Sequence, residues 1–232
     1  MRGLFIILIF GSSFAFGQVQ DAEFWGGLGL KANLTKDLSV KYETQSRFYK
    51  NVSTLKNYYN EIAVNYEVIK RLKVGVSYRY ARKNRETFFE GENRLCFNAG
   101  YGYKLGETGL RLKARARYQF AFDRLGTINE VVYPGQKHVF RLKMDLRYKN
   151  SAFKRVLPHV GYELFKDIQP SGLSGLSAYR VYGGLDFDLP ARHELSLKYI
   201  YEFNNASVLN AAHIYMVQYN YELPSKLFKS GK

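Results

Sequence analysis

The sequence predicts an all-β fold, specifically a single antiparallel transmembrane β-barrel of about 10–12 strands. Apolar and polar residues alternate along most of the chain, as in 111–122, RLKARARYQFAF, where Arg and Lys occupy every second position up to 117. A period of two places the two kinds of side chain on opposite faces of a strand. Short turns also alternate with longer polar loops, which is the plan of an outer-membrane barrel.

Each predicted strand is defined by such an alternation. The eleven segments, in chain order, are 24–34, 38–43, 61–68, 72–80, 95–105, 111–122, 140–148, 160–164, 180–189, 194–203 and 215–223. In the first five the polar face mixes small and charged residues, in the next two it is mainly Arg and Lys, and in the last four it carries acids. A closed antiparallel barrel requires an even number of strands. We therefore expect ten or twelve, with 24–34 as a plug or an irregular edge if the other ten are correct.

Connections between these segments fall into two groups. The short turns are 35–37, 69–71, 106–109, 150–155 and 190–192. The longer polar loops are 50–56, 82–92, 123–136, 166–177 and 204–212. Short periplasmic turns and longer extracellular loops are typical of outer-membrane barrels.

The direction of the apolar face separates two all-β alternatives. In a soluble lipocalin-like barrel the apolar face points inward, whereas in a membrane barrel it points to lipid. Tyr and Phe gather near strand ends on the apolar face, for example Phe120 with Phe122 and Tyr219 with Tyr221, as an interfacial aromatic belt would require. Small residues on the polar face, such as Gly75 and Gly100, suit a crowded lumen. These features favour the membrane barrel.

Residues 1–17 are predicted to be a signal peptide and 18–232 the barrel. Arg2 precedes the apolar core LFIILIF, and Ala15-Phe16-Gly17 provides small residues at cleavage spacing. The apolar stretch 3–16 is too short to cross a bilayer core of ~30 Å as a helix. The alternative is a buried N-terminal strand.

The formal net charge is +15, and such a basic balance is compatible with nucleic acid, anionic lipid or an acidic ligand. Export argues against nucleic acid as a partner. The single cysteine, Cys96, cannot form an internal disulfide, and we interpret it as a packed side chain.

The order of elements resembles a known family. The chain contains FWGGLGLKANLTKDLSVKYETQSRF near its start, then YRVYGGLDFDLPARHELSLKYIYEF and HIYMVQYNYEL near its end. These patterns of Gly, Tyr and Leu are similar to those of the Bacteroidetes outer-membrane β-barrel family called domain of unknown function 2490, over roughly 22–223. The resemblance implies a barrel in the outer membrane. It implies no functional residues, because the family has no assigned activity.

If the apolar rows face lipid, the charged rows face the lumen. The predicted basic ladder is Lys73, Arg79, Lys104, Arg111, Lys113, Arg115, Arg117, Arg141, Lys143 and Arg147. The predicted acidic wall is Glu61, Glu67, Asp186, Asp188, Glu194, Glu202 and Glu222, with Glu43 and Glu163 also inward. Unpaired charges at low dielectric are costly, so we expect the two sets to pair and fill the bore.

No pattern predicts a catalytic residue, a metal site or a cofactor. His159 and His193 lie beside short turns, His138 and His213 lie near long loops, and we expect all four to face water at the rims. The leading hypothesis is a non-enzymatic outer-membrane barrel with a charge-filled lumen. The alternatives are a narrow anion-preferring pore and an enzyme with a rim active site. Outer-membrane lipid is the expected partner, and loops 82–92 and 123–136 could contact a protein.

Overall fold

The computed structural model describes residues 20–123, 136–149, 155–169, 172–205 and 211–224. The predicted signal peptide, 1–17, lies outside these ranges. Eleven strands form the described wall: β1 (Gln20–Asn33), β2 (Leu38–Tyr49), β3 (Thr54–Ile69), β4 (Leu72–Asn84), β5 (Phe89–Lys104), β6 (Leu110–Asp123), β7 (Gln136–Tyr148), β8 (Val156–Gln169), β9 (Gly172–Leu189), β10 (His193–Asn204) and β11 (Ala211–Glu222). No helix in the described part of the chain is long and apolar enough to cross a membrane.

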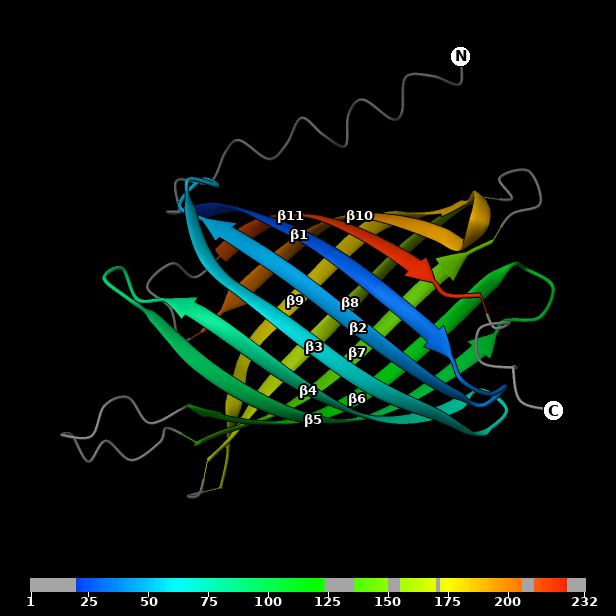
Figure 1. The fold of residues 1–232 in the computed structure, drawn as a ribbon, viewed down its shortest axis with the longest axis horizontal. Coiled ribbons are helices and arrows are strands. Elements are labelled where there is room, and N and C mark those ends of the chain that lie inside the picture. The colour runs from blue at the N-terminus through cyan, green and yellow to red at the C-terminus, as the bar shows by residue number, and fades with distance from the viewer. Residues whose placement is uncertain (1–19, 124–135, 150–154, 170–171, 206–210, 225–232) are drawn as a thin grey trace, which may run out of the picture.

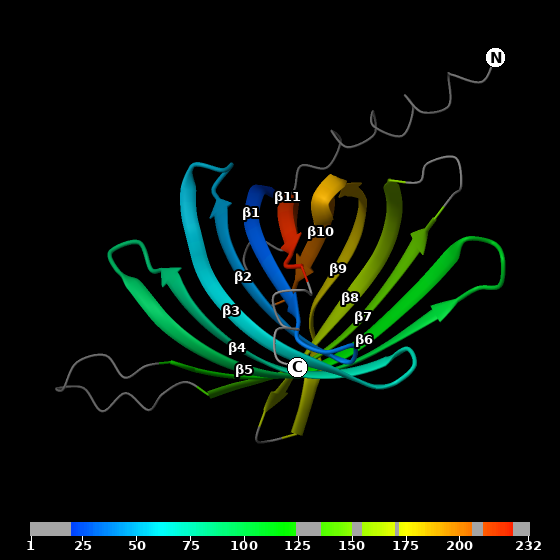
Figure 2. The ribbon, with the colours of Figure 1, turned by 45° about the vertical axis from the view of Figure 1, so that its right-hand side comes forward.

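The strands close into one barrel in sequence order, with β1 beside β11 (Figures 1 and 2). Every neighbouring pair is antiparallel except β1 and β11, which are parallel from Gln20↔Ala211 to Lys31↔Glu222. The predicted even strand number is therefore wrong, and 24–34 is neither a plug nor an irregular edge. An odd number closes here because the first and last strands run in the same direction and form a parallel ladder.

Two rims are defined by the connections. Among the described residues, the turn rim contains the connections 34–37, 70–71, 105–109 and the 3-10 turn Pro190–Arg192, and the loop rim contains the connections 50–53 and 85–88. Strand β1 begins at the loop rim, whereas β11 ends at the turn rim (Figure 1). The chain thus enters the wall at the loop rim and leaves it at the turn rim.

Two of the predicted loops are shorter than expected. In 82–92, strands β4 and β5 stay paired through Lys83↔Glu90 to Asn84↔Phe89, which leaves a turn of 85–88. In 166–177, β8 and β9 stay paired to Gln169↔Gly172. The polar residues that suggested a loop in 82–92 instead form ion pairs, including that of Lys83 on β4 with Glu92 on β5. Most of the predicted loop 123–136 lies outside the described residues.

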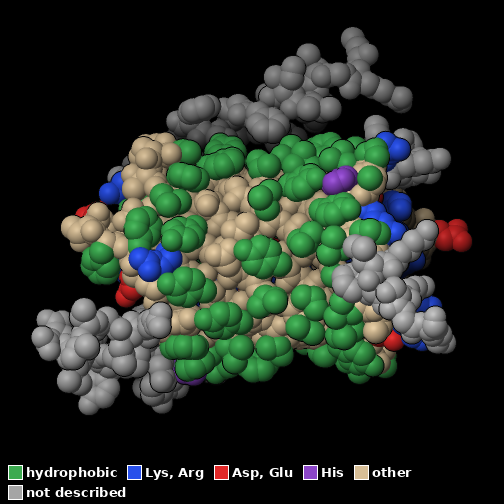
Figure 3. Space-filling model, viewed as in Figure 1, with side chains coloured by type: hydrophobic (Ala, Val, Ile, Leu, Met, Phe, Trp, Pro, Cys, Tyr) green, Lys and Arg blue, Asp and Glu red, His purple; other side chains and the backbone are tan. Residues whose placement is uncertain are grey.

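The outer face of the wall is apolar. Leu28, Ile62 and Val160 each expose at least half of their surface, although they lie in the middle portion of regular strands. On the face shown in Figure 3, hydrophobic side chains cover the wall and charged ones gather toward the two ends. Charged and amide side chains on the alternate positions point inward, where many are buried. The apolar face is therefore outside, opposite to the arrangement in a soluble barrel.

Candidate functional site

Side chains from most strands meet in the lumen at about the middle of the barrel. This mid-barrel layer consists of Trp25, Arg47, Tyr59, Glu61, Arg79, Arg117, Arg141, Glu163, Phe165, Arg180 and Glu202. Alternation places all of them on the inward face of strands whose other face is apolar.

Stacked cations and aromatic rings connect distant parts of this layer. The Arg47 guanidinium lies 3.9 Å from the centre of the Trp25 ring and 5.2 Å from that of Tyr59. Arg180, on β9, lies 5.0 Å from the Trp25 ring on β1, although β10 and β11 separate these strands in the wall. Each such contact is attractive because the face of an aromatic ring is electron-rich. Arg180 therefore reaches over the seam side of the bore.

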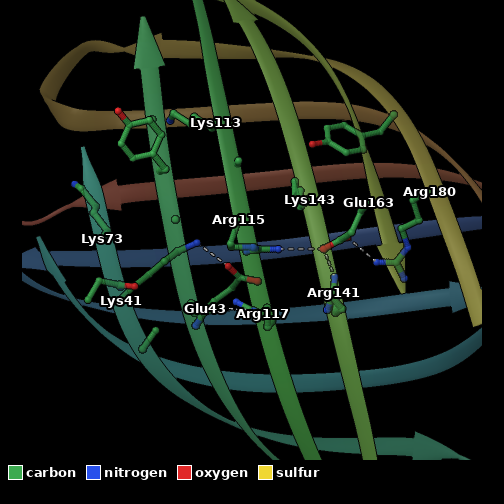
Figure 4. A pocket seen from close by; sticks show the side chains of 18 of the residues that line it. Lys41, Glu43, Lys73, Lys113, Arg115, Arg117, Arg141, Lys143, Glu163 and Arg180 are labelled. Atoms are coloured by element: carbon green, nitrogen blue, oxygen red, sulfur yellow. Dashed lines mark hydrogen bonds and ion pairs between the residues drawn. The ribbon is translucent and has the colours of Figure 1, made fainter. Parts of the chain in front are cut away.

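Glu163 is the centre of the ion pairs in the layer (Figure 4). Its carboxylate lies 2.7 Å from Arg141, 3.1 Å from Arg115 and 3.6 Å from Arg180. The Glu163 side chain is only 5% exposed. Three guanidinium groups thus share one buried carboxylate, and Arg180 also pairs with Glu202.

The seam side of the lumen is apolar rather than charged. Ile200 and Ile214 point inward and pack with Trp25 and Tyr182, and Ile214 is completely buried. These isoleucines interrupt the polar alternation on β10 and β11. Together with the mid-barrel layer they occupy the bore where β9, β10, β11 and β1 meet.

The half of the lumen between this layer and the loop rim is packed. Cys96, Gln119 and Ala121 expose between 0% and 5% of their surface, and Glu92 is equally buried. The Gln119 amide donates to the Cys96 sulfur at 3.6 Å. Cys96 is thus a packed side chain beside a polar neighbour.

The other half contains a cavity of about 680 Å³, here called the vestibule. Its lining extends from Trp25 and Arg180 in the mid-barrel layer to Arg71 and Lys104 at the turn rim. Of the described residues that line it, fourteen are Lys or Arg and three are Glu. The vestibule is therefore strongly basic, and its cations surround the space shown in Figure 4.

The structure places the predicted basic ladder along this lumen. Six of its members have a carboxylate within 4.0 Å: Lys73, Arg79, Arg115, Arg117, Arg141 and Arg147. The other four have no ion pair with any described residue: Lys104, Arg111, Lys113 and Lys143. Lys143 instead lies 4.6 Å from the centre of the Tyr182 ring.

Members of the predicted acidic wall occupy different depths of the lumen. Glu61 and Glu202 belong to the mid-barrel layer, and Asp186 is buried beside Arg147 at 2.7 Å. Nearer the turn rim, Glu67 pairs with Lys73, and Glu222 pairs with Lys31. Glu194 accepts a hydrogen bond from Asn220. Asp188 is exposed.

Most of these ion pairs join strands that are neighbours. Glu61 lies directly opposite Arg79 in the β3–β4 register, and Glu67 opposite Lys73. The Cβ atoms of such partners are only ~4.5–5.5 Å apart, so these residues form ion pairs with each other more readily than with charges on the opposite side of the lumen. The contact of Arg117 with Glu61 is the longer connection, because β4 and β5 lie between their strands.

Several lumen residues were not singled out from the sequence. Arg47, Trp25, Tyr59, Arg180 and Lys198 all line the vestibule. Trp25, Arg180 and Lys198 already lie within the predicted strands 24–34, 180–189 and 194–203, whereas the signal that could have identified Arg47 and Tyr59 is the same alternation, continued toward the ends of each strand. It was missed where the predicted strands were too short, as in 38–43, which stops before Arg47.

The prediction that His159 faces water is wrong. Its side chain is 0% exposed, and Nδ1 lies 3.4 Å from the Asp186 carboxylate. Gly184 makes room for the ring, since a Cβ at this position would lie 2.9 Å from His159 Nε2. Ser196 donates to the same Asp186, but the carboxylate lies between hydroxyl and imidazole. This order differs from a catalytic triad, where the histidine contacts the nucleophile.

The other three histidines lie on the outer face, each beside a tyrosine of a neighbouring strand. The Tyr hydroxyl and His Nδ1 are 2.5–2.6 Å apart in Tyr118–His138, Tyr199–His213 and Tyr219–His193. His138 and His213 lie near the loop rim and His193 near the turn rim. They are part of an aromatic surface instead of isolated rim groups. No group of His, Cys, Asp or Glu among the described residues could hold a metal ion.

The fold and lumen define a closed eleven-stranded β-barrel with an apolar outer face and a charged, partly filled interior. The chain belongs to the family described as protein of unknown function DUF2490, whose model matches residues 22–212. Comparison with the curated proteins finds no match. Among solved structures, the chain is similar to the β domain of the Bordetella autotransporter BrkA, with 11% identity and a TM-score of 0.43, over 75% of this chain and 78% of that one.

Proposed function

We propose that the chain is an integral outer-membrane protein, without enzymatic activity, whose lumen is closed at mid-height and open toward the periplasm as a basic vestibule. Placement in Bacteroidetes, which the resemblance implies, is part of this proposal. The observation that carries it is the mid-barrel layer. There the guanidinium groups of Arg47 and Arg180 both lie over the Trp25 ring, and the Glu163 carboxylate pairs with three guanidinium groups.

The outer face supports the membrane location. A membrane-spanning strand needs ~9–11 residues at a tilt, and the described strands have 12–18 residues. Their outward side chains are Leu, Val, Ile, Tyr and Phe, with Tyr–His pairs near both rims. Outer-membrane barrels have aromatic residues at both interfaces and an apolar band between them. Lipid is therefore the proposed partner of this face.

The proposed orientation follows from the connections. Outer-membrane barrels have short turns on the periplasmic side. The turn rim includes the two-residue connection 70–71 and the 3-10 turn Pro190–Arg192. The vestibule opens at this rim, and so it would take its contents from the periplasm.

Planar-bilayer recording of the purified chain tests closure at mid-height. We expect no steady conductance from the wild type. The double variant Arg47→Ala, Arg180→Ala removes two side chains that stack on Trp25 and should give measurable current with a preference for anions. The matched control is Arg85→Ala with Lys137→Ala, which removes two exposed cations at the loop rim and should stay closed. A steady anion current in the wild type would support the alternative, a narrow pore.

A further inference from the structure

The vestibule holds more positive charge than the described carboxylates neutralise. Lys113, Lys143 and Lys198 come from β6, β7 and β10 and have no ion pair with a described residue. Arg115 and Arg141 lie beside them, and both share Glu163 with a third arginine. Gathering unpaired cations in a confined space is costly, so a bound anion would stabilise the barrel.

We propose that the vestibule binds a small, soluble compound carrying two or more phosphate charges. A cavity of about 680 Å³ lies within the ~300–1,000 Å³ range of small-molecule sites. Arg115 and Arg141 supply planar forks that match phosphate oxygens, and the lysines supply mobile point charges. This inference rests on the proposed function only for the direction from which the ligand enters.

The closed wall favours a soluble ligand over a lipid headgroup. Each strand pairs with both neighbours, and the seam between β1 and β11 is paired over twelve residue pairs. A lipid would have to pass its acyl chains through this wall to place a phosphate beside Lys143. The turn rim, in contrast, gives direct access from water, since Lys104 and Arg111 line the vestibule there.

The sole tryptophan of the chain, Trp25, provides a reporter. It lines the vestibule and lies under Arg47 and Arg180. The experiment titrates inorganic pyrophosphate into the full chain in detergent micelles and follows tryptophan emission, at constant ionic strength maintained with chloride. We expect a saturable change in emission. The triple variant Lys113→Gln, Lys143→Gln, Lys198→Gln should bind at least about tenfold more weakly.

The control triple variant is Lys50→Gln, Arg85→Gln, Lys137→Gln, which loses the same charge from exposed positions at the loop rim. It should bind pyrophosphate as the wild type does. A second arm uses nanodiscs with and without phosphatidic acid and no free phosphate. Absence of a saturable change with pyrophosphate, equal affinity in both triple variants, or a response only to phosphatidic acid would each overturn the proposal.

Folding of the variants is checked separately by the mobility shift on heating in SDS gels, and Lys143→Arg serves where the triple variant does not fold. It retains the charge and should keep at least half of the affinity, whereas Lys143→Gln should lose affinity. Conductance and binding are independent readouts. A conducting wild type that still binds pyrophosphate would contradict the closed lumen but not this inference.

Discussion

The guanidinium of Arg117 on β6 lies 3.8 Å from the carboxylate of Glu61 on β3, although β4 and β5 separate their strands in the wall. The same carboxylate accepts from Arg79 on β4 at 2.6 Å. Both side chains of the longer pair are only 10% exposed. Glu61 thus links three strands inside the lumen, where solvent screens charges less than at a surface.

Removal of the Glu163 charge should strongly destabilise the barrel. In Glu163→Gln, Arg115 and Arg141 lose the one carboxylate with which each is paired among the described residues. Breaking a buried ion pair costs about 3–5 kcal/mol. We expect the free energy of unfolding, measured by denaturant titration in detergent, to fall by about 3 kcal/mol. In Glu86→Gln, whose side chain is 75% exposed, the loss should stay below about 0.5 kcal/mol, and equal losses would contradict the prediction.

Gly161 should not tolerate a methyl group, whereas Gly102 should. A Cβ at Gly161 would lie 2.3 Å from both the Met144 carbonyl and the Tyr182 hydroxyl, but at Gly102 nothing lies within 4 Å. Overpacking of this kind costs about 1–3 kcal/mol. The unfolding midpoint of Gly161→Ala should fall and that of Gly102→Ala should hold or rise. A neutral Gly161→Ala would mean that Tyr182 is not fixed where the structure places it.

The Tyr–His pairs of the outer face should stabilise the barrel through the hydrogen bonds of their hydroxyl groups. Tyr199→Phe removes the hydroxyl that lies 2.5 Å from His213 Nδ1 and should cost about 1 kcal/mol of unfolding free energy. Tyr66 is also exposed, and its hydroxyl makes no hydrogen bond within the described part of the chain. Tyr66→Phe should therefore change stability by less than about 0.5 kcal/mol. Equal effects in denaturant titrations would remove any role for the pairs.

Cysteine labelling of intact cells should reveal the proposed orientation. With Cys96 replaced by Ala, Ser53→Cys places a thiol at the loop rim, and Glu107→Cys places one at the turn rim. A membrane-impermeant maleimide should label the first in intact cells and the second only after permeabilisation. Wild-type Cys96, which is completely buried, should react only in denaturant. The reverse order of labelling would invert the orientation and place the vestibule mouth outside the cell.

Much of the wall could be predicted because alternation fixes which face each side chain occupies. Arg117 and Arg141 point into the lumen, whereas Tyr118 and Phe140 point outward, because adjacent residues of a strand face opposite ways. The ion pairs depend on register between strands. To predict the register, one must know which residues of two strands lie opposite each other, such as Glu61 and Arg79. The sequence of either strand alone does not contain that information.

Other features were missed for specific physical reasons. The burial of His159 depends on space left by Gly184 on a neighbouring strand, so proximity to a turn was a poor guide to exposure. The prediction of about 10–12 strands is confirmed by the eleven that are observed, but the expectation of an even number was wrong because that rule assumes that the first and last strands are antiparallel. Lys83 and Glu92 were assigned to a loop because they are charged, whereas in the structure they lie on β4 and β5 and form an ion pair with each other.

The parallel seam between β1 and β11 has a consequence for the order of assembly. Its contacts join residues as far apart as Lys31 and Glu222, which are 191 positions apart, whereas all other strand pairs form between consecutive strands. Contacts of such long range carry a high loop-closure entropy and form late. Until both ends of the sheet meet, β1 and β11 are open edges that can pair with another chain. The seam is thus the final step of folding and the place where an unfinished barrel is most prone to exchange strands with its neighbours.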